Sequence, residues 1–371
     1  MADIDIPISE PVIDEDDAEA VYEVVQSGWV TQGEEVEKFE EKFSDYVGVD
    51  HSIAVFNGTV ALHVLLEALD IGEGDEVIVP TLSYVASANA VEYTGAKPVL
   101  CESDPDTYNV RPDLVEPHIT DDTAAIMTVD MNGTPVDFEA FSRLAQSYDI
   151  EFISDSAESL GAEYKDNKVG GQAKAHTFSM YPNKSITTAE GGMVTTNDDK
   201  LANRLRTLRH QGQDGRYNHV EVGFNYRMTE MQAALGRSQL DKIDSTLERK
   251  DSTAQRYNEE LSDIAGLGVP VIPEYVTAHS WYMYTISVED PYDRDALVEY
   301  LNQEGIDTRL SFPPIHGQKA YREEYGYKPS DYPLSQEAWE SLLNLPISPR
   351  LSEKEQDRVL SALRDFVESN A

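Results

Sequence analysis

Apolar runs typical of buried strands alternate with helix-like segments from residue 51 to about residue 200, and this alternation constrains the fold more than any other feature. Strands alternating with helices imply a sheet whose strands are mainly parallel. We therefore predict an α/β fold with a mostly parallel sheet covered by helices on both faces. The strand-like runs are HSIAVF (51–56), GDEVIVP (74–80), KPVLCE (97–102), AAIMTVD (124–130) and EFISDSA (151–157).

Helical spacing continues on both sides of this region. Residues 14–28 and 34–48 predict two helices that each stop at a glycine, and a longer helix is predicted from Met228 to about Lys250. A long helix of this kind usually joins a large domain to a small one. We therefore predict a large domain at residues 1–248, including the N-terminal segment, and a smaller α/β domain at residues 249–371. The smaller domain is expected to hold a strand at 281–288, a helix at 294–305, a strand at 306–310 and a final helix from Ser352.

The formal net charge is −40, from 29 basic and 69 acidic residues. A field of this sign repels phosphates, so binding to DNA, RNA or an anionic membrane is not expected. The acidic residues are spread along periodic apolar segments, which favours a folded protein over a disordered one. Salt screens the self-repulsion of such a surface, and we expect a halophilic source.

The single cysteine, Cys101, excludes an internal disulfide and fits a reducing cytosol. The N-terminal residues MADIDIPISEP lack the basic and apolar regions of a secretory signal. No apolar run approaches the roughly 18 residues needed to span a bilayer. We therefore expect a cytoplasmic protein, and we expect no metal centre.

Ligands of parallel sheets collect at the carboxyl ends of the strands. The residues that follow the predicted strands are therefore the candidates for a functional site. They are the turn Asn57-Gly58-Thr59, which is followed by a helix and so has the form of a phosphate-binding turn, then Tyr84, Asp130, Asp155 and the loop that holds Lys184.

Lys184 is the lone lysine of a short polar loop between two strand-like runs, residues 177–181 and the run that begins at Gly192. Two strands would hold this amine rigidly. A desolvated lysine beside other polar groups is expected to have a lowered pKa and can form a Schiff base with an aldehyde. On this loop alone, a solvated surface lysine is the alternative.

Asp155 ends a buried strand, where a carboxylate is costly without a cationic partner. A pyridinium nitrogen is such a partner, and its proton makes the ring an electron sink. A helix-capping aspartate is the alternative at this position. Tyr84 could stack on such a ring or could pack in the core, and Gly58, Thr59 and Ser179 could hold a phosphate.

With these motifs the sequence resembles the DegT/StrS family of sugar aminotransferases. The resemblance implies a fold type I enzyme that has a seven-stranded sheet and depends on pyridoxal 5'-phosphate (PLP). The resemblance runs over nearly the whole chain. The segments that carry it are FNGTVALHVLLEAL (56–69), GDEVIVPTLSYVASANAV (74–91), GAKPVLCE (95–102), DSAESLGAEYKDNKVGG (155–171), FSMYPNKSITTAEGGMVTTND (178–198), VGFNYRMTEMQAALGRSQL (222–240) and, more weakly, SFPPIHGQ (311–318).

The resemblance implies that Lys184 carries PLP as a Schiff base, that Asp155 pairs with the pyridine nitrogen and that Tyr84 stacks on the ring. It implies that Gly58, Thr59 and Ser179 bind the cofactor phosphate.

The family also completes its phosphate site from a second subunit, which implies a homodimer with a shared active site. Asn225 is the first choice for that contact and Arg227 the second. Arg309 and His316 match positions near the sugar-nucleotide end of the pocket, and for both an ordinary loop residue is the alternative.

Two positions depart from the family pattern. Glu158 stands where relatives usually have glutamine or histidine, and an ionised Glu158 would be repelled by the phenolic oxygen of PLP unless one of the two holds a proton. Asp130 stands where many relatives have histidine. The resemblance therefore does not decide whether Glu158 and Asp130 contact the substrate.

The implied reaction transfers an amino group from an amino acid, most often glutamate in this family, to a keto-sugar that is expected to be nucleotide-linked. Three alternatives follow from the same residues. A PLP-dependent sugar dehydratase of the same family would carry histidine in place of Lys184. A cysteine desulfurase would need a mobile cysteine, which Cys101 in a predicted strand is not. A non-catalytic sensory or regulatory protein could retain the fold, although the charge of −40 opposes DNA binding.

Overall fold

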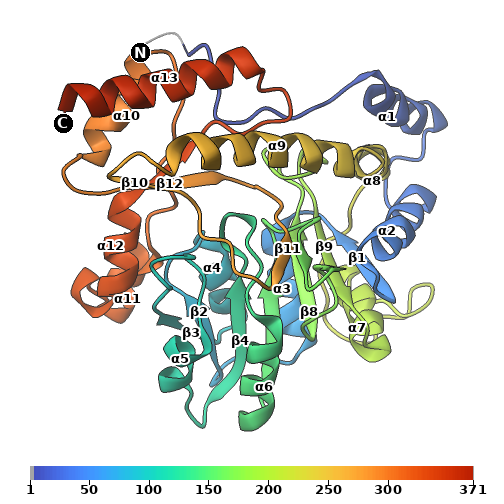
Figure 1. Ribbon diagram of the computed structural model, residues 1–371. Helices are drawn as coiled ribbons and strands as arrows, with labels where there is room; N and C mark the ends of the chain where they lie inside the picture. Colours follow the sequence, from blue (N-terminus) through green and yellow to red (C-terminus); the bar gives the residue numbers. More distant parts are fainter. Residues whose placement is uncertain (1–3, 371) are drawn as a thin grey trace.

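The computed structural model describes residues 4–370, and its largest element is a seven-stranded sheet (Figure 1). Its strands are β1 (His51–Val55), β2 (Glu76–Pro80), β3 (Lys97–Cys101), β4 (Thr123–Val129), β5 (Glu151–Asp155), β8 (Ala175–Ser179) and β9 (Gly192–Thr196).

The order of these strands is β1-β9-β8-β5-β4-β2-β3. Neighbours from β8 to β3 pair in parallel, whereas β9 is antiparallel to both β1 and β8. The predicted mostly parallel α/β sheet of seven strands is therefore confirmed.

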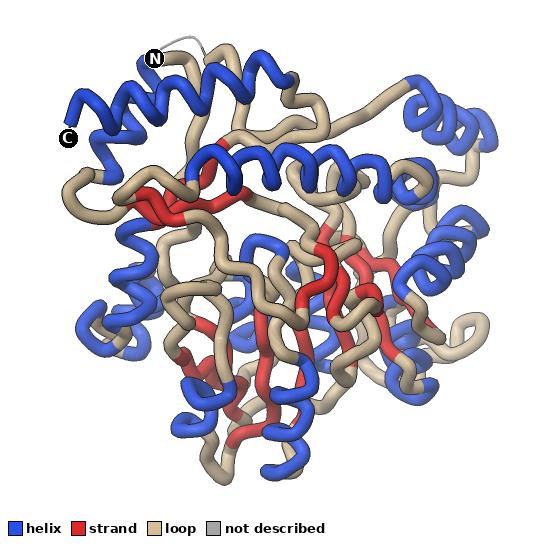
Figure 2. The backbone as a smooth tube through the Cα atoms, in the orientation of Figure 1, coloured by secondary structure: helices blue, strands red, loops and turns tan. Residues whose placement is uncertain are grey.

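Apolar side chains alternate between the two faces of this sheet because successive residues of a strand point in opposite directions. Ala54 and Ile78 belong to one buried cluster, while Ile53 and Val55 belong to another. Each cluster is closed by helices, which flank the strands in Figure 2. The helices of this part of the chain are α1 (Glu15–Ser27), α2 (Glu34–Val47), α3 (Gly58–Ala68), α4 (Ala86–Tyr93), α5 (Pro112–Val115), α6 (Phe138–Tyr148), α7 (Asp199–Arg209) and α8 (Glu230–Leu240).

The predicted boundaries of the first two helices match their capping residues. Asp14 caps α1 by accepting a hydrogen bond from the backbone N–H of Asp17, and Gly28 ends it in the left-handed conformation. Gly48 ends α2 in the same way. Both glycines have positive φ angles, which other residues rarely adopt.

The C-terminal part of the chain builds a second core around a three-stranded sheet of the order β10-β12-β13. A third small sheet pairs β11 with the hairpin β6–β7. The remaining strands are β6 (Glu163–Tyr164), β7 (Asn167–Lys168), β10 (Leu267–Gly268), β11 (Val276–Ala278), β12 (Tyr284–Val288) and β13 (Leu342–Leu345). The remaining helices are α9 (Ile243–Leu261), α10 (Arg294–Gln303), α11 (Lys319–Tyr325), α12 (Pro333–Ser341) and α13 (Glu353–Asn370).

Helix α9 connects the two cores. Ile243 packs in a core cluster of the large sheet, whereas Ala254, Tyr257 and Leu261 pack in the C-terminal cluster. In Figure 1, α9 runs along the upper edge of the sheet, with α10 and α13 above it. The division at residue 248 falls inside this continuous helix and stays a prediction. The N-terminal residue Ile6 also packs in the C-terminal cluster.

Two predicted elements differ in the structure. The single helix expected from Met228 to about Lys250 is interrupted at Asp241 and Lys242, so that α8 and α9 take different directions (Figure 1). The strand expected at 306–310 is present only as isolated bridges of Ile306 with Ile6 and of Arg309 with Asn344. Its two ends pair with different segments, so no continuous ladder forms.

Candidate active site

A cavity of about 460 Å³ lies where β5 and β8 end, at the carboxyl edge of the parallel strands. Its wall is built from loops of the large sheet and from three residues of the C-terminal part of the chain. The lining residues are Asn57, Gly58, Thr59, Leu62, Ser83, Tyr84, Ala86, Val129, Asp155, Ala157, Glu158, Thr177, Phe178, Ser179, Tyr181, Asn183, Lys184, Glu190, Tyr282, Arg309 and Phe312.

Lys184 lies in the loop between β8 and β9, and its side chain is 12% exposed. The Nζ atom is 3.6 Å from Glu158 Oε1 and 3.8 Å from the centre of the Tyr282 ring. Burial alone lowers the pKa of Lys184, but Tyr282, Glu158 and Asp155 raise it, and the net pKa lies above the ordinary value. The expectation of a lowered pKa is therefore wrong for the protein alone, because Tyr282, Glu158 and Asp155 together favour the ammonium form of Lys184.

Asp155 is the last residue of β5 and is buried in the lining of the same cavity. Its Oδ2 accepts a hydrogen bond of 2.8 Å from Ser87 Oγ, and its Oδ1 accepts one of 3.2 Å from the backbone N–H of Ala157. Burial raises the pKa of Asp155, and Ser87, Ala157 and Lys184 oppose that shift. The carboxyl group is thus fixed in orientation and needs a positive partner to stay ionised.

Glu158 is the second carboxyl group of the cavity, and its side chain is 6% exposed. Its Oε2 accepts a hydrogen bond of 2.8 Å from the backbone N–H of Asn132, and its Oε1 faces Lys184. Burial raises the pKa of Glu158, while Lys184 and the Asn132 N–H lower it. Glu158 therefore depends on Lys184 for its negative charge.

The N-terminus of α3 forms a cradle at one end of the cavity. Asn57 caps the helix by accepting a hydrogen bond of 2.9 Å from the backbone N–H of Val60, which leaves the first turn open toward the lining residues Gly58 and Thr59. A Cβ at Gly58 would lie 2.9 Å from Ser179 Cβ, so a larger residue would fill the cradle. A helix N-terminus beside a serine hydroxyl suits a phosphate.

Two buried polar atoms of the lining lack partners among the described residues. They are Thr177 Oγ1 and Asn183 Oδ1. Buried polar atoms are normally hydrogen-bonded, so these two favour a polar ligand in the cavity. These residues fit a pyridoxal phosphate group: the α3 cradle would hold its phosphate, Asp155 would pair with its ring nitrogen and Lys184 would form the Schiff base with its aldehyde.

Aromatic rings form the outer wall of the cavity. The ring of Tyr84 is 54% exposed and tilted against that of Phe312, with 5.0 Å between their centres, and Tyr181 is also exposed. Arg309 lies on the same side and, with Lys184, is one of two cations among the described lining residues. This mouth combines apolar area with one positive charge.

Three of the residues predicted for the site lie outside the cavity lining. The ring of His316 is fully buried between Thr81 Oγ1, at 2.8 Å, and Gln336 Oε1, at 3.0 Å. Asn225 is exposed, and Arg227 donates a hydrogen bond of 2.9 Å from Nε to Asn225 Oδ1. Within a single chain, these three residues therefore do not line the cavity that contains Lys184.

Asp130 also lies away from the cavity and is fully buried. Its Oδ2 accepts hydrogen bonds from Ser156 Oγ at 2.8 Å and Ser159 Oγ at 2.6 Å. Burial raises its pKa to about 7. Asp130 thus holds the segment between Asp155 and Glu158 in place rather than facing a substrate.

Tyr282, Asn183 and Phe312 line the cavity but were not predicted. Asn183 donates a hydrogen bond of 2.9 Å from Nδ2 to Tyr282 Oη, so the tyrosine is anchored to the loop of Lys184. Tyr282 lies inside the strand predicted at 281–288 but precedes β12, which begins at Tyr284. No pattern in the sequence around Tyr282 predicts that its ring reaches Lys184.

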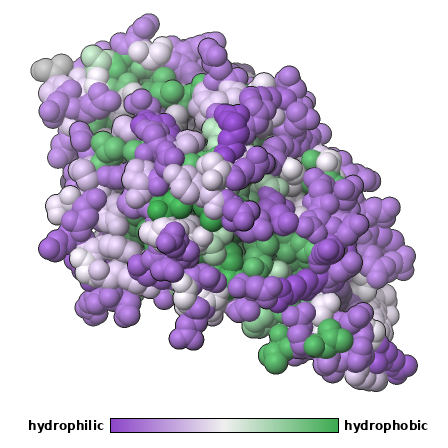
Figure 3. Space-filling model, turned by 90° about the horizontal axis from the view of Figure 1, so that it is seen from below, coloured by the Kyte–Doolittle hydropathy of each residue, from purple (hydrophilic) through white to green (hydrophobic). Residues whose placement is uncertain are grey.

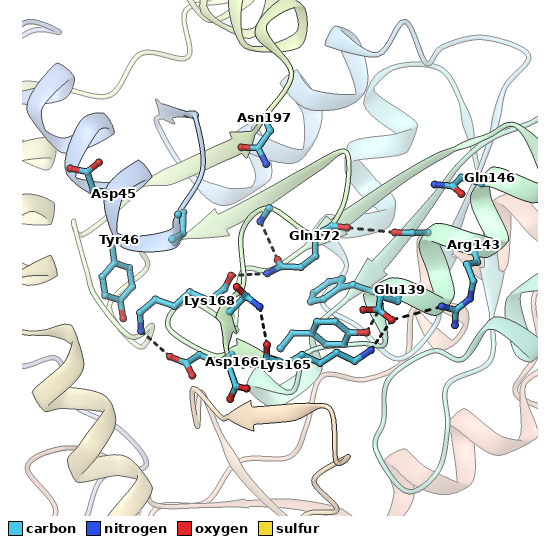
Figure 4. Close-up of a pocket in the computed structure, with 18 residues that line it drawn as sticks. Asp45, Tyr46, Glu139, Arg143, Gln146, Lys165, Asp166, Lys168, Gln172 and Asn197 are labelled. Atoms are coloured by element: carbon cyan, nitrogen blue, oxygen red, sulfur yellow. Dashed lines mark hydrogen bonds and ion pairs between the residues drawn. The ribbon is translucent and has the colours of Figure 1, made fainter.

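A wider cleft of about 830 Å³ lies elsewhere, between the end of α2, α6 and the hairpin β6–β7 (Figure 4). Its basic side chains are already paired. Lys165 is 2.7 Å and Arg143 3.8 Å from Glu139, and Lys168 is 3.5 Å from Glu163. The cleft therefore offers no buried group of the kind that distinguishes the cavity around Lys184.

The chain is similar to known proteins over nearly its whole length. The model of the DegT/DnrJ/EryC1/StrS aminotransferase family matches residues 11–364. GDP-perosamine synthase of Caulobacter vibrioides is 40% identical over 366 residues, which cover 96% of this chain and 97% of that protein. The structure of S. venezuelae DesV superposes with a TM-score of 0.93 at 35% identity and 98% coverage of both chains. The PLP form of Spr1654 from Streptococcus pneumoniae has a TM-score of 0.93 at 28% identity and 99% coverage of both chains.

Proposed function

Because this chain belongs to the DegT/DnrJ/EryC1/StrS aminotransferase family and is a PLP-dependent sugar aminotransferase, we propose that it aminates a nucleotide-linked keto-sugar with glutamate as the donor. The observation that carries this proposal is the convergence of Lys184, Asp155 and the α3 cradle on one cavity with an open aromatic mouth. The buried end suits the cofactor, and the open end suits a long acceptor.

When bound, PLP supplies an electron sink for the carbon that loses or gains a proton. Lys184 is the acid and base: it takes a proton from the α-carbon of the donor, and in the second half-reaction it delivers one to the former keto carbon. Asp155, oriented by Ser87, keeps the ring nitrogen protonated. The side chains of Lys184 and Glu158 are only 12% and 6% exposed, which limits the water around the reacting groups.

We propose that the acceptor carries GDP. The support is the 40% identity to an enzyme named GDP-perosamine synthase over nearly the full length of both chains. Arg309 is the proposed contact for the diphosphate, because guanidinium groups bind phosphate oxygens in pairs. The exposed rings of Tyr84 and Tyr181 offer stacking area for the sugar or the base.

A panel of nucleotide-linked keto-sugars tests this proposal. The purified protein, loaded with PLP, is incubated with glutamate and GDP-, UDP- or dTDP-linked keto-sugars at high salt, and the products are identified by mass spectrometry. Amination of the GDP-linked acceptor in preference to the others is the expected result. Loss of a hydroxyl group without amination would point to a dehydratase, and no turnover of any acceptor would favour the sensory alternative.

We also propose a homodimer in which Asn225, and secondarily Arg227, contacts the cofactor phosphate of the other subunit. Support comes from their absence from the cavity of their own chain and from exposed apolar residues such as Phe56, at 44%, and Val222, at 93%. Mixing inactive Lys184→Ala and Asn225→Ala proteins should then restore about a quarter of the activity, because heterodimers contain one intact site. Two variants that stay inactive after subunit exchange would contradict a shared site.

The acidic surface supports a further proposal, that the protein works in a salt-rich cytoplasm. Hydrophilic residues cover most of the face in Figure 3, and apolar residues occupy limited areas of it. Within residues 4–370, no helix is both long enough and apolar enough to cross a membrane. With a charge of −40, stability should depend on ionic strength.

A further inference from the structure

The cavity contains an uneven set of charges. Asp155 and Glu158 are two buried carboxyl groups, and Lys184 is the cation that lies 3.6 Å from Glu158 and interacts at longer range with Asp155. The second cation of the lining, Arg309, forms no ion pair with Glu158 among the described residues. A buried carboxylate without a partner is costly, so the charge of Glu158 is coupled to that of Lys184.

Condensation with the cofactor removes that positive charge when the imine nitrogen that forms is neutral. The Lys184 ammonium carries three hydrogens on nitrogen. When a carbon–nitrogen double bond forms with an aldehyde, two of them leave in water together with the aldehyde oxygen, and the third leaves as a proton when the imine nitrogen is neutral. No electrons are gained or lost. A protonated ring nitrogen would still give Asp155 a positive partner, but beside a neutral imine Glu158 would have none.

We infer that this proton passes from the Lys184 nitrogen to Glu158, 3.6 Å away, so that in the cofactor-loaded enzyme the imine nitrogen is neutral and Glu158 is a neutral carboxylic acid. The inference rests on the proposed chemistry at Lys184. It also explains how glutamate can replace the glutamine that relatives usually have at position 158. A protonated glutamic acid, like glutamine, can donate a hydrogen bond to an anionic oxygen of the ligand. Glu158 is thus a positioning residue whose protonation follows the state of Lys184.

Among the described residues around Glu158, none except Lys184 provides a permanent positive charge that would balance an ionised Glu158 carboxylate. The backbone N–H of Asn132 is a single neutral donor. Tyr282 is a neutral phenol whose pKa is raised by burial. Behind the cavity, Asp130 adds another carboxyl group, and Lys250 is a buried amine whose pKa is lowered to about 7 by burial and by Lys184. No described basic side chain other than Lys184 lies within 4 Å of the Glu158 carboxyl group.

Infrared difference spectroscopy tests the inference directly. The spectrum of the apoprotein is subtracted from that of the PLP-loaded protein at pH 8. A new carboxylic-acid C=O band, of about one carboxyl per bound cofactor, is expected, and it should shift in D2O. Glu158→Gln should remove the band. Asp130→Asn is the matched control and should retain it, because Asp130 is buried nearby without facing Lys184.

Proton counting by calorimetry gives a second measurement. Cofactor binding in buffers of different ionisation enthalpy should release about one proton more from Glu158→Gln than from the wild type, because the variant cannot retain the proton of Lys184. A loaded wild-type protein without the band, or a band that persists in Glu158→Gln, would overturn the inference. The wild-type spectrum decides the question even if that variant does not fold.

The two proposals fail separately. A loaded enzyme that transfers amino groups but lacks the band refutes the protonation of Glu158 alone. A loaded enzyme that shows the band but aminates no keto-sugar refutes the proposed acceptor alone.

Discussion

Replacing Gly58 by alanine should weaken the binding of the cofactor phosphate. The added Cβ would lie 2.9 Å from Ser179 Cβ and 3.2 Å from Ser179 Oγ, closer than carbon atoms approach in folded proteins. Either the start of α3 or the end of β8 must move, so the cradle between them opens. A displaced hydrogen bond to a charged group costs about 1.5–3 kcal/mol. This corresponds to a dissociation constant for PLP that is roughly 10- to 150-fold higher.

The assay compares PLP with pyridoxal, which lacks the phosphate. Both compounds condense with Lys184, and their binding is followed by absorbance. In the wild type, PLP should bind far more tightly than pyridoxal, and in Gly58→Ala this ratio should fall by the factor given above. Pyridoxal binding itself should change little, which separates a damaged cradle from a damaged lysine site.

Gly72→Ala is a matched control close to the other end of α3. A Cβ at Gly72 would meet the Thr94 carbonyl oxygen at 3.5 Å, an ordinary contact, so PLP binding and thermal stability should stay near the wild-type values. If Gly58→Ala retains the wild-type ratio of PLP to pyridoxal affinity, then the N-terminus of α3 does not hold the phosphate.

Four other predictions follow from the same structure. Borohydride reduction of the loaded protein should fix one cofactor on the peptide that contains Lys184, and Lys184→Ala should yield no adduct there in mass spectrometry. His316→Ala should lower the free energy of unfolding by about 3 kcal/mol, through the cavity and the two lost hydrogen bonds, yet leave PLP affinity unchanged in a titration; a selective loss of substrate binding would contradict this structural role. The pKa of Asp130 is raised from 3.8 to about 7, so its contribution to stability is full below pH 3.8 and is lost as the pH rises through 7. Asp130→Asn should remove that loss, and denaturant unfolding between pH 4 and pH 8 will show it as a flatter profile than that of the wild type. Raising KCl from 0.1 M to 1 M shortens the Debye length from about 10 Å to about 3 Å and should raise the melting temperature. An unchanged melting temperature would show that the acidic surface is not an adaptation to high salt.

The residues at the strand ends could be located from the sequence because parallel strands end at a shared edge. Asp155 ends β5, Ser179 ends β8, and Gly58 follows β1 by a short turn. Each position depends on a local pattern, an apolar run and the polar residue after it. The convergence of these residues with Lys184 on one cavity follows from the sheet.

Residues from the C-terminal part of the chain could not be placed in this way. Tyr282, Arg309 and Phe312 reach the cavity because the second core packs over the first, and nothing in their local sequence encodes that packing. His316 shows the reverse case. It lies in a family-like segment, yet Thr81 and Gln336 hold its ring inside the protein.

The direction of the pKa shift of Lys184 also could not be predicted from the sequence around this residue. Burial, which we expected to dominate, lowers the pKa of Lys184, but the outcome depends on Tyr282 from the C-terminal part of the chain and on Glu158 and Asp155 from β5 and the turn after it. Such a shift is decided by distances of a few ångströms between segments that are apart in sequence.

The position of β9 explains why the lysine loop meets the phosphate cradle. β9 lies between β1 and β8 and is antiparallel to both, so Gly192 is the register partner of Val55 at the end of β1 and of Ser179 at the end of β8. A Cβ at Gly192 would lie 2.3 Å from the Asn57 carbonyl oxygen, which shows how closely the turn before α3 approaches β9. A slip of one residue in this register would place every β9 side chain on the opposite face and would separate Ser179 from Gly58. The position of the Lys184 loop relative to the α3 cradle therefore depends on one non-local pairing, which no pattern within either segment specifies.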